Sequence, residues 1–453
     1  MDAAILGNAL ENATADTTIL MYMEREQIQA HLADSIPQSF TQTLFHGVGC
    51  RSLVKGSWGF SSSTNIKDTP EIVKIAEQMA SLTSQQVNFA ESEPVSGEWC
   101  PEIKKPVTIE DMDILFEFIK EADEAVKDIP AIVSDSVSIF IIHDDKVIMS
   151  SEGTHIHQIE PRIICSLTVT AKKSGKIAQG REITGGERGL EFFEKGYLAE
   201  TAVNLAHRVS RKIDAVLPPS GTLPVLLSGE VVGLLTHEAV GHAAEADAAQ
   251  GESFLSGRIN EMVASPNISI VDDATVPGGF GTYGFDDEGV PAQSTRIIDN
   301  GILKSYLHSR ETASNFKTHS TGNARAWLFS REPLVRMSNT HLLPESMSFE
   351  ELLEEVKTGL YLSGDKGGSA DRNGQFTFAT TDAQKIEKGE LTEEYYLGTT
   401  IAGDTLEALK TCTAVGDDKT FVLRASICSK GESAFVGGGG PALVTKLHVG
   451  GGI

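Results

Sequence analysis

The sequence predicts an α+β protein in which a duplicated region of helices and strands precedes a large, mostly antiparallel, barrel-like β domain that carries one functional helix. Three observations predict this class. Glycine is frequent, with 43 of 453 residues, which favours turns and strand connections over a helical bundle. The first 216 residues twice show a helix plus several strands. The remainder contains mainly short strand-like segments separated by glycine.

The first predicted α+β domain covers residues 1–100. The spacing of apolar residues predicts a helix over 16–34, strands within 40–61 and a second helix over 70–82. Residues 91–107 are polar and contain prolines, which is typical of a linker or a long loop. This loop leads into the second predicted domain.

The second predicted α+β domain covers residues 101–217. Thr108 followed by two acidic residues is a helix start signal and predicts a helix over 109–127. The remaining predicted elements are strands at about 131–150 and 160–173, a turn at Asp144-Asp145 and a long helix over roughly 187–215. The Pro- and Gly-containing segment 217–221 ends this helix and is the strongest predicted boundary.

The third predicted domain, residues 218–453, is rich in strands. It opens with a short apolar strand, and one helix follows at about 230–248. Strand-like segments then dominate, interrupted by a single predicted helix near 348–358. The four glycines at 437–440 are expected to form a tight turn.

Composition limits the classes of function. The chain has 63 acidic and 38 basic residues, a formal charge of −25, so its surface repels phosphate and no nucleic-acid partner is expected. No apolar run is long enough to span a membrane, and the N-terminal sequence is not typical of a signal peptide. Five scattered cysteines favour a reducing compartment, so a cytoplasmic protein is expected.

The segment 234–247, LLTHEAVGHAAEAD, contains the pattern HExxxH. Imidazoles are common zinc ligands, and a carboxylate beside a ligand can take a proton from a metal-bound water. His237 and His242 are five positions apart, which on a regular α-helix turns the second ring roughly 140° away from the first. A one-residue π-bulge would bring the rings together, and Gly241 allows the backbone to relax. The pattern predicts a metal site on a distorted helix, with Glu238 as candidate base.

A catalytic zinc needs a third protein ligand and one open position. Glu245 lies three positions after His242 and can either bind the metal or orient the imidazole from outside. Cys428, at the end of a predicted strand, is the distant alternative. Tyr306 and His308 are candidates for stabilising an oxyanion, against the more common structural role of such residues.

Several blocks resemble the TldD/PmbA family, and within it the metal-bearing TldD-type peptidases. The Gly-rich stretch 47–62 resembles a hairpin of the family, and the helix motif continues to Glu245 and Asp247 as in that family. Further similar blocks lie at 281–313, 321–325, 336–340, 367–378 and 427–441. In the last block this chain has Cys-Ser-Lys where the family usually has Cys-Gly-Lys.

The resemblance implies a zinc-dependent peptidase that hydrolyses unfolded or flexible peptides inside the closed chamber of a dimer. It implies that His237, His242 and Cys428 hold the metal, that Glu238 is the base, and that Glu245 is an outer or structural residue. The implied partner is a second copy or a metal-lacking TldE/PmbA-like paralogue. Two imidazoles and a thiolate suit zinc and also accept iron or cobalt. The alternative is a non-catalytic scaffold or regulatory subunit with a structural metal.

Overall fold

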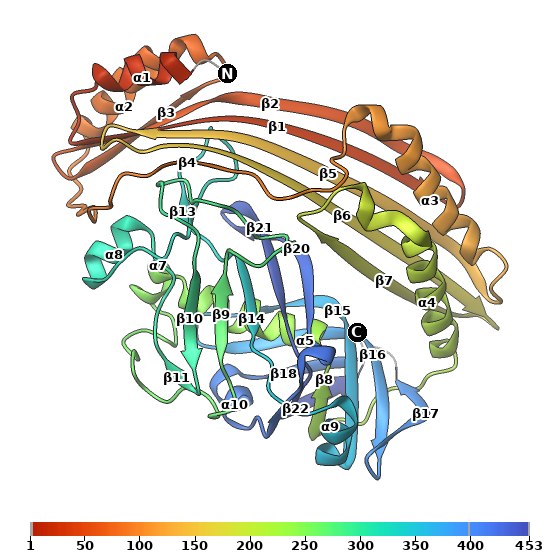
Figure 1. Cartoon of the computed structure of the whole chain (residues 1–453). Coiled ribbons are helices and arrows are strands. Elements are labelled where there is room, and N and C mark those ends of the chain that lie inside the picture. Colours follow the sequence, from red (N-terminus) through yellow and green to blue (C-terminus); the bar gives the residue numbers. More distant parts are fainter. Residues whose placement is uncertain (1–2, 397–398, 452–453) are drawn as a thin grey trace.

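Two lobes make up the molecule: a long curved sheet arches over a second lobe built from a barrel and a smaller sheet (Figure 1). The computed structural model describes residues 3–396 and 399–451. Helices cover parts of both lobes, and the prediction of an α+β fold with a barrel-like β domain is confirmed. Among the described residues, no helix is long and apolar enough to cross a membrane.

The curved sheet has seven strands in the order β3-β2-β1-β5-β6-β4, and β7 pairs with β6. Strands from both predicted N-terminal domains therefore join in one sheet. The bounds are β1 (Thr17–Ala33), β2 (Ile36–Val54), β3 (Ser57–Ser63), β4 (Ser96–Trp99), β5 (Ile132–Ser150), β6 (His155–Lys173) and β7 (Lys176–Gly186). The short strand β4 lies within the segment predicted as a long loop.

The helix expected over 16–34 is wrong, because these residues form strand β1. Buried and partly exposed residues alternate from Ile28 to Leu32, as in a strand with one face in a core. β1 lies between β2 and β5 and pairs with both. Pairing with strands on both sides overrides the local helical spacing of this segment.

The turn expected at Asp144-Asp145 is also wrong, since both residues lie inside β5. Each aspartate contacts a side chain from a neighbouring strand: Arg25 Nε lies 2.6 Å from Asp144, and His157 Nε2 lies 3.0 Å from Asp145. The chain instead reverses after Ser150, where β5 ends and β6 begins at His155.

Helices pack at both ends of the curved sheet. α1 (Ala3–Glu11) contacts α2 (Thr69–Leu82), which packs on β2 and β3, while α3 (Met112–Val126) and α4 (Tyr197–Lys212) pack on each other and on β5, β6 and β7. The predicted helices over 70–82 and 109–127 are confirmed. The one expected over 187–215 consists of the 3₁₀ segment η3 (Leu190–Gly196) followed by α4.

A closed barrel of five strands forms one half of the second lobe. Its strands follow the order β15-β8-β22-β18-β16, and β15 closes the ring by pairing with β16. The bounds are β8 (Gly221–Leu227), β15 (Thr358–Ala370), β16 (Gln375–Glu387), β18 (Thr399–Asp404) and β22 (Leu443–Gly451). Two further strands pair with barrel strands outside the ring: β17 (Glu390–Tyr396) with β16 and β19 (Ala414–Val415) with β22. α9 (Phe349–Val356), which confirms the predicted helix near 348–358, and α10 (Thr405–Lys410) pack on the barrel.

A six-stranded sheet forms the other half of this lobe, in the order β11-β10-β9-β14-β21-β20. The bounds are β9 (Ile270–Asp273), β10 (Ser294–Asp299), β11 (Ile302–Leu303), β14 (Asn339–Leu342), β20 (Val422–Lys430) and β21 (Glu432–Gly440). A two-stranded ribbon, β12 (Ala324–Arg325) and β13 (Leu334–Val335), and a short helix, α8 (Arg310–Phe316), complete it.

One helical run connects the barrel to this sheet and contributes to the largest hydrophobic core of the molecule. It comprises α5 (Gly229–Leu234), the π-helical segment η4 (Leu235–Gly241), α6 (His242–Ala244) and α7 (Ala246–Ala249). The predicted helix at about 230–248 is therefore confirmed, with a break at Glu245, whose backbone is extended.

The four glycines at 437–440 form the end of strand β21 and not the expected tight turn. The strand lies between β20 and β14 and packs against α5. A Cβ atom at Gly229 would lie 2.3 Å from the carbonyl oxygen of Gly440, and one at Gly233 would lie 2.9 Å from that of Gly438. Side chains are absent here because the two backbones touch, and this contact fixes the helix relative to the β20–β21 hairpin.

Candidate metal centre

The π-helical segment η4 brings the two histidines of HExxxH to one side of the helix. The amide of His242 donates to the carbonyl of His237, five residues earlier, which is the π-helical hydrogen bond. The ring centroids lie 5.1 Å apart. A Cβ at Gly241 would lie 2.0 Å from Met337 Sδ, so only glycine fits this turn without displacing its neighbour. The predicted distortion of the helix is confirmed.

Cys428 on β20 completes a group of three metal-type donors. Its Sγ lies 3.1 Å from His242 Nε2, and one candidate donor atom from each of His237, His242 and Cys428 lies within 4.8 Å of the others. His237 Nδ1 is buried without a hydrogen-bond partner in the described structure. Two imidazoles and a sulfur are a donor set that fits a divalent ion and leaves it one open position. The unpartnered nitrogen of His237 agrees with a site that expects a further ligand.

The thiol and the imidazole favour each other's charged forms. Burial would raise the pKa of Cys428, but His237 and His242 beside it lower that pKa to about 6. Burial would lower the pKa of His242, but Cys428 and Glu245 raise that pKa to about 10. The cluster thus favours the thiolate, which is the form of cysteine that binds metals.

Glu238 lies on the open side of the cluster. Its carboxylate oxygens are 4.0 Å from His237 Nε2 and 3.9 Å from His242 Nε2, beyond hydrogen-bonding distance from both rings. The side chain is 30 % exposed. Glu238 and His237 line a cleft of about 70 Å³, whose walls include Ser426 of β20 and Gly438 of β21. A carboxylate therefore faces the position where a small molecule would approach the donors.

Glu245 lies on the other side of the His242 ring. His242 Nδ1 lies 3.0 Å from its Oε2, whereas Nε2 of the same ring faces Cys428. The carboxylate is fully buried and also accepts a hydrogen bond from Lys430 Nζ at 3.0 Å. Burial would raise its pKa, but His242 and Lys430 lower it. Of the two roles that the sequence left open, this contact fits the outer one, in which the carboxylate orients the imidazole, and the role of Glu245 stays a prediction.

Two cations that the sequence analysis did not single out hold the β20–β21 hairpin in place. Lys430 Nζ lies 2.7 Å from Asp247 as well as contacting Glu245. Arg336 is 1 % exposed, and its guanidinium donates to the carbonyl of Cys428 at 3.1 Å. Their positions in the sequence could have identified them: Lys430 follows Cys428 by two residues, and Arg336 is the first residue of one of the family-like blocks.

Tyr306 and His308 lie beside the end of the helical run and contact other groups. The Tyr306 hydroxyl donates to the carbonyl of Leu255 at 2.6 Å, and His308 Nδ1 lies 3.3 Å from Thr312 Oγ1. Burial lowers the pKa of His308 to about 4, so its ring is neutral. Both described contacts are structural, and a role for either residue with an oxyanion stays a prediction.

Three family models match the chain in sequence order. Residues 20–83 match domain 1, residues 104–209 match the central domain, and residues 220–451 match the C-terminal domain of PmbA/TldA metallopeptidases.

Similar proteins cover most of the chain. A metalloprotease of Methanocaldococcus jannaschii is 37 % identical over 92 % of this chain and 93 % of its own length. A zinc metalloprotease TldD homolog of Saccharolobus solfataricus is 32 % identical over 71 % of this chain and 72 % of its own length.

Solved structures share the fold at low sequence identity. TldE from Thermococcus kodakarensis has a TM-score of 0.76 at 18 % identity, covering 99 % of this chain and 100 % of its own. A Thermotoga maritima protein described as a modulator of a DNA gyrase has a TM-score of 0.81 at 21 % identity, covering 99 % and 98 %. With its three matched domains and its relatives above 30 % identity, this chain belongs to the PmbA/TldD family of metallopeptidases.

Proposed function

We propose that this metallopeptidase hydrolyses unfolded or flexible peptides with a zinc ion held by His237, His242 and Cys428. One observation carries the proposal: a π-helical segment and a strand 186 residues further along the chain place two imidazoles and a sulfur around one point. This donor set suits zinc, and one relative is named a zinc metalloprotease.

Each residue of the cluster has a distinct task in the proposed hydrolysis. Zinc, when bound, lowers the pKa of water and polarises the carbonyl of a peptide. Glu238 accepts the proton of the attacking water and passes it to the leaving amine, since its carboxylate faces both rings without being bonded to either. Glu245 holds His242 through Nδ1, which keeps Nε2 directed at the cluster.

The shape of the cleft favours an extended substrate. The cleft beside the cluster measures about 70 Å³, too small for a folded protein. Part of its wall is glycine and alanine of β20 and β21, where a peptide can approach the backbone closely. An enzyme that binds its substrate through the peptide main chain has little sequence specificity. This agrees with a substrate that is selected because it is flexible and not because of its sequence.

The proposal includes a dimer that encloses the site, with a second copy or a metal-lacking TldE/PmbA-like paralogue as partner. Residues 36–46 of β2 support it, because in the described structure they pair only with β1 and leave their other edge unpaired. Apolar side chains are exposed along this edge, namely Ile36, Phe40, Leu44 and Phe45. Soluble proteins rarely leave a long apolar edge strand uncovered.

Metal content and peptide cleavage, measured on the same samples, test the proposal. The zinc-loaded chain should cleave an unstructured peptide, and a chelator should abolish the cleavage. Glu238→Gln should keep zinc and lose at least ~100-fold in kcat/KM, the loss expected for a missing general base. Cys428→Ser should lose both zinc and activity, because an outer partner alone changes metal affinity by about 10–100-fold and a direct ligand contributes more.

Two results would contradict the proposal. Full turnover by Glu238→Gln would remove the glutamate as base. A zinc-loaded wild-type chain that cleaves no unstructured peptide would favour the alternative, a non-catalytic scaffold or regulatory subunit whose metal is structural.

A further inference from the structure

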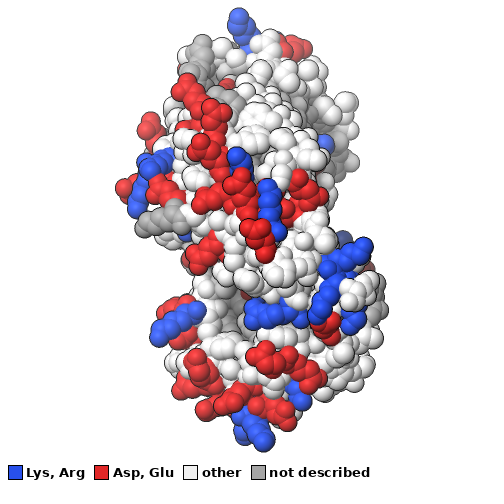
Figure 2. Space-filling model, turned by 90° about the vertical axis from the view of Figure 1, so that its right-hand side faces the viewer, with Lys and Arg blue, Asp and Glu red and all other residues white. Residues whose placement is uncertain are grey.

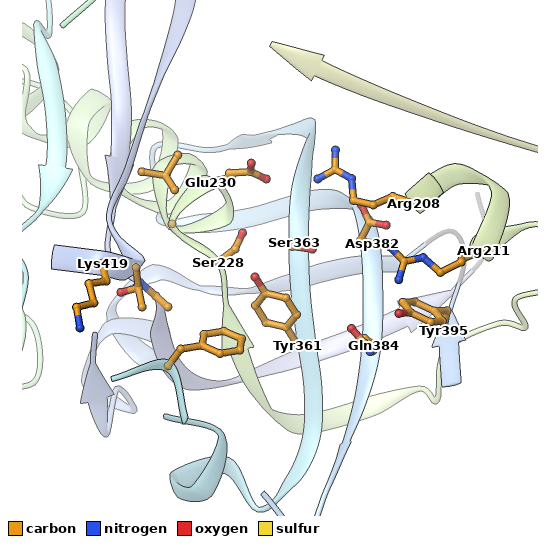
Figure 3. Close-up of a pocket in the computed structure, with 15 residues that line it drawn as sticks. Arg208, Arg211, Ser228, Glu230, Tyr361, Ser363, Asp382, Gln384, Tyr395 and Lys419 are labelled. Atoms are coloured by element: carbon orange, nitrogen blue, oxygen red, sulfur yellow. The ribbon is translucent and has the colours of Figure 1, made fainter. Parts of the chain in front are cut away.

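A second cavity, of about 510 Å³, adjoins the cleft of the metal centre (Figure 3). Its wall combines Arg208 and Arg211 of α4 with side chains of β15, β16 and β17. Glu230, at the start of the helical run that carries His237, lines both this cavity and the cleft. The cavity and the cleft are therefore neighbours on either side of Glu230.

Most charged groups in the cavity already have partners. Arg208 lies 2.6 Å from Glu182, Asp382 is paired with Lys212, and Glu230 accepts a hydrogen bond from the amide of Gly364. Two lining cations, Arg211 and Lys419, and one lining carboxylate, Glu230, form no ion pair with any described residue. Arg211 Nε donates only a long hydrogen bond of 3.4 Å, to the carbonyl of His207. Two unpaired cations against one unpaired carboxylate make the net unpaired charge of the lining positive, although the whole chain carries −25.

Charged side chains are unevenly spread on the face shown in Figure 2: acidic ones are scattered over both lobes, and several basic ones lie close together at and just below the waist between the lobes. A negatively charged ligand is thus attracted to the waist more than to the lobes.

Polar groups inside the cavity also lack partners. The Ser228 side chain is 8 % exposed, and its Oγ has no hydrogen-bond partner in the described structure. Arg208 Nε is buried and unpartnered as well. Figure 3 shows the Ser228 and Tyr361 hydroxyls directed into the space between the walls. Buried donors without partners are costly, and a ligand with acceptor oxygens would satisfy them.

We propose that this cavity, named here the carboxylate pocket, binds a carboxylate of the peptide substrate; this rests on the proposed function. Arg211 is the main anchor, since a guanidinium can hold a carboxylate through two parallel hydrogen bonds. Lys419, on η5 (Asp418–Thr420) at the opposite wall, adds positive potential. The hydroxyls of Ser228 and Tyr361 are further donors.

The position of the pocket sets a minimum distance from the scissile bond. Glu230 precedes His237 by seven residues on one helical run, which corresponds to about 10 Å along the axis. An extended peptide advances about 3.3 Å per residue. The bound carboxylate therefore belongs to a residue about three or more positions from the cleaved bond, either as the C-terminus or as an acidic side chain.

Peptide binding to zinc-loaded Glu238→Gln protein separates recognition from cleavage. Three fluorescent peptides of one flexible sequence serve as probes: the free acid, the C-terminal amide, and the amide with glutamate as its last residue. We expect the free acid to bind about tenfold tighter than the amide by fluorescence anisotropy. Tight binding of the glutamate amide as well would identify an acidic side chain as a second source of the carboxylate.

Arg211→Gln, added to Glu238→Gln, should abolish this preference, since it removes the guanidinium that is the main anchor for the carboxylate. Arg296→Gln is the matched control, because Arg296 is an exposed arginine on β10 and does not line the pocket. Equal affinity for the three peptides would overturn the proposal, as would a preference that survives Arg211→Gln.

Cleavage by the wild-type chain shows which proposal fails. Selective binding of the acid without any cleavage would reject the peptidase function and keep the pocket. Cleavage of acid and amide with equal kcat/KM, together with equal binding, would reject only the pocket.

Discussion

At the scale of single residues, Glu160 is the centre of a buried group of charges that joins the two lobes. Its carboxylate lies 2.7 Å from Arg162 and 3.0 Å from Lys146, and all three side chains are at most 6 % exposed. Arg162 also donates to the carbonyls of Phe280 and Thr282 in the second lobe. Removing one member of such a group leaves a buried charge without compensation.

The first prediction is that Glu160 contributes stability that depends on pH. Burial would raise the pKa of Glu160, but Lys146 and Arg162 hold that pKa at about 2, against 4.5 for an unperturbed glutamate. Because the folded pKa is the lower one, the contribution is complete above pH 4.5 and is lost as the pH falls towards 2. Glu160→Gln should lower the free energy of unfolding at pH 7 by about 3 kcal/mol.

Urea unfolding of wild type and Glu160→Gln at pH 7, 5, 4 and 3 measures this effect. The difference between the two proteins should shrink as the pH falls. Glu390→Gln, an exposed glutamate on β17, is the control and should change stability by about 0.5 kcal/mol or less at every pH. A difference that stays constant from pH 7 to pH 3 would contradict the assigned pKa.

The candidate site shows how far residue types alone determine a prediction. The spacing of His237 and His242 required a distorted helix, and the π-helical segment supplies it. The choice between Glu245 and Cys428 stayed open on the residues alone, because it depends on packing between segments 183 or more residues apart. Local patterns carry no information on such contacts, so the residues alone offered both candidates and the preference for the cysteine came from the resemblance.

At the scale of elements, the contact between α5 and β21 sets the position of the metal centre. Gly229 and Gly233 face the glycine-rich end of β21 with no side chain between the two backbones. β21 in turn pairs with β20, which carries Cys428. The distance between the histidines and the sulfur thus depends on how closely this helix approaches this strand.

The second prediction is that Gly233→Ala destabilises the protein and weakens zinc binding. Alanine is intrinsically better than glycine in a helix by about 1 kcal/mol, so an unhindered substitution would stabilise. Here the new Cβ would lie 2.9 Å from the Gly438 carbonyl oxygen, and the backbones must separate. We expect a loss of about 1–3 kcal/mol in unfolding free energy and a lower zinc affinity in competition with a chelating dye.

Gly450→Ala is the matched control, since a Cβ built at Gly450 meets no atom of the described residues within 4 Å apart from its chain neighbours. It should leave zinc affinity unchanged. A Gly233→Ala protein that is more stable than wild type and binds zinc equally well would show that the helix has room to move.

Helices and strands differed in how well the sequence predicted them. Segments whose periodicity agrees with their environment, such as α2 and α9, were predicted correctly. β1 was predicted wrongly. Its apolar residues have helical spacing, namely Ile19, Leu20, Met23, Ile28 and Leu32, but β2 and β5 pair with it on both sides and hold it extended. The glycines of β21 were misassigned for a similar reason, since their use is a close contact with a helix that local sequence does not reveal.

At the scale of the whole molecule, the curved sheet ends in an edge that needs a cover. Apart from His46, β2 contains no acidic or basic side chain before Arg51. Acidic residues are frequent elsewhere, and a charge of −25 on each copy opposes association through most of the surface. A neutral edge with unpaired backbone groups is where two such chains can approach and extend the sheet.

The last prediction is that a second copy binds along residues 36–46. The wild-type chain should have a mass about twice its 48.6 kDa in light scattering. Leu44→Lys should shift it to the monomer, because facing lysines repel and a lysine blocks edge pairing. The folded monomer tolerates this change, since Leu44 is 56 % exposed and lies opposite Glu26 on β1.

Leu82→Lys controls for the loss of any exposed leucine, because Leu82 is 86 % exposed at the end of α2, away from the edge. It should remain dimeric. A Leu44→Lys chain that stays dimeric would move the interface elsewhere. A wild-type chain that is monomeric alone would exclude self-association and leave a paralogue as the partner for the edge.

If the dimer encloses the candidate site, as proposed, Leu44→Lys should also admit folded proteins that the wild-type chain does not cleave, which a protease assay on a folded substrate detects.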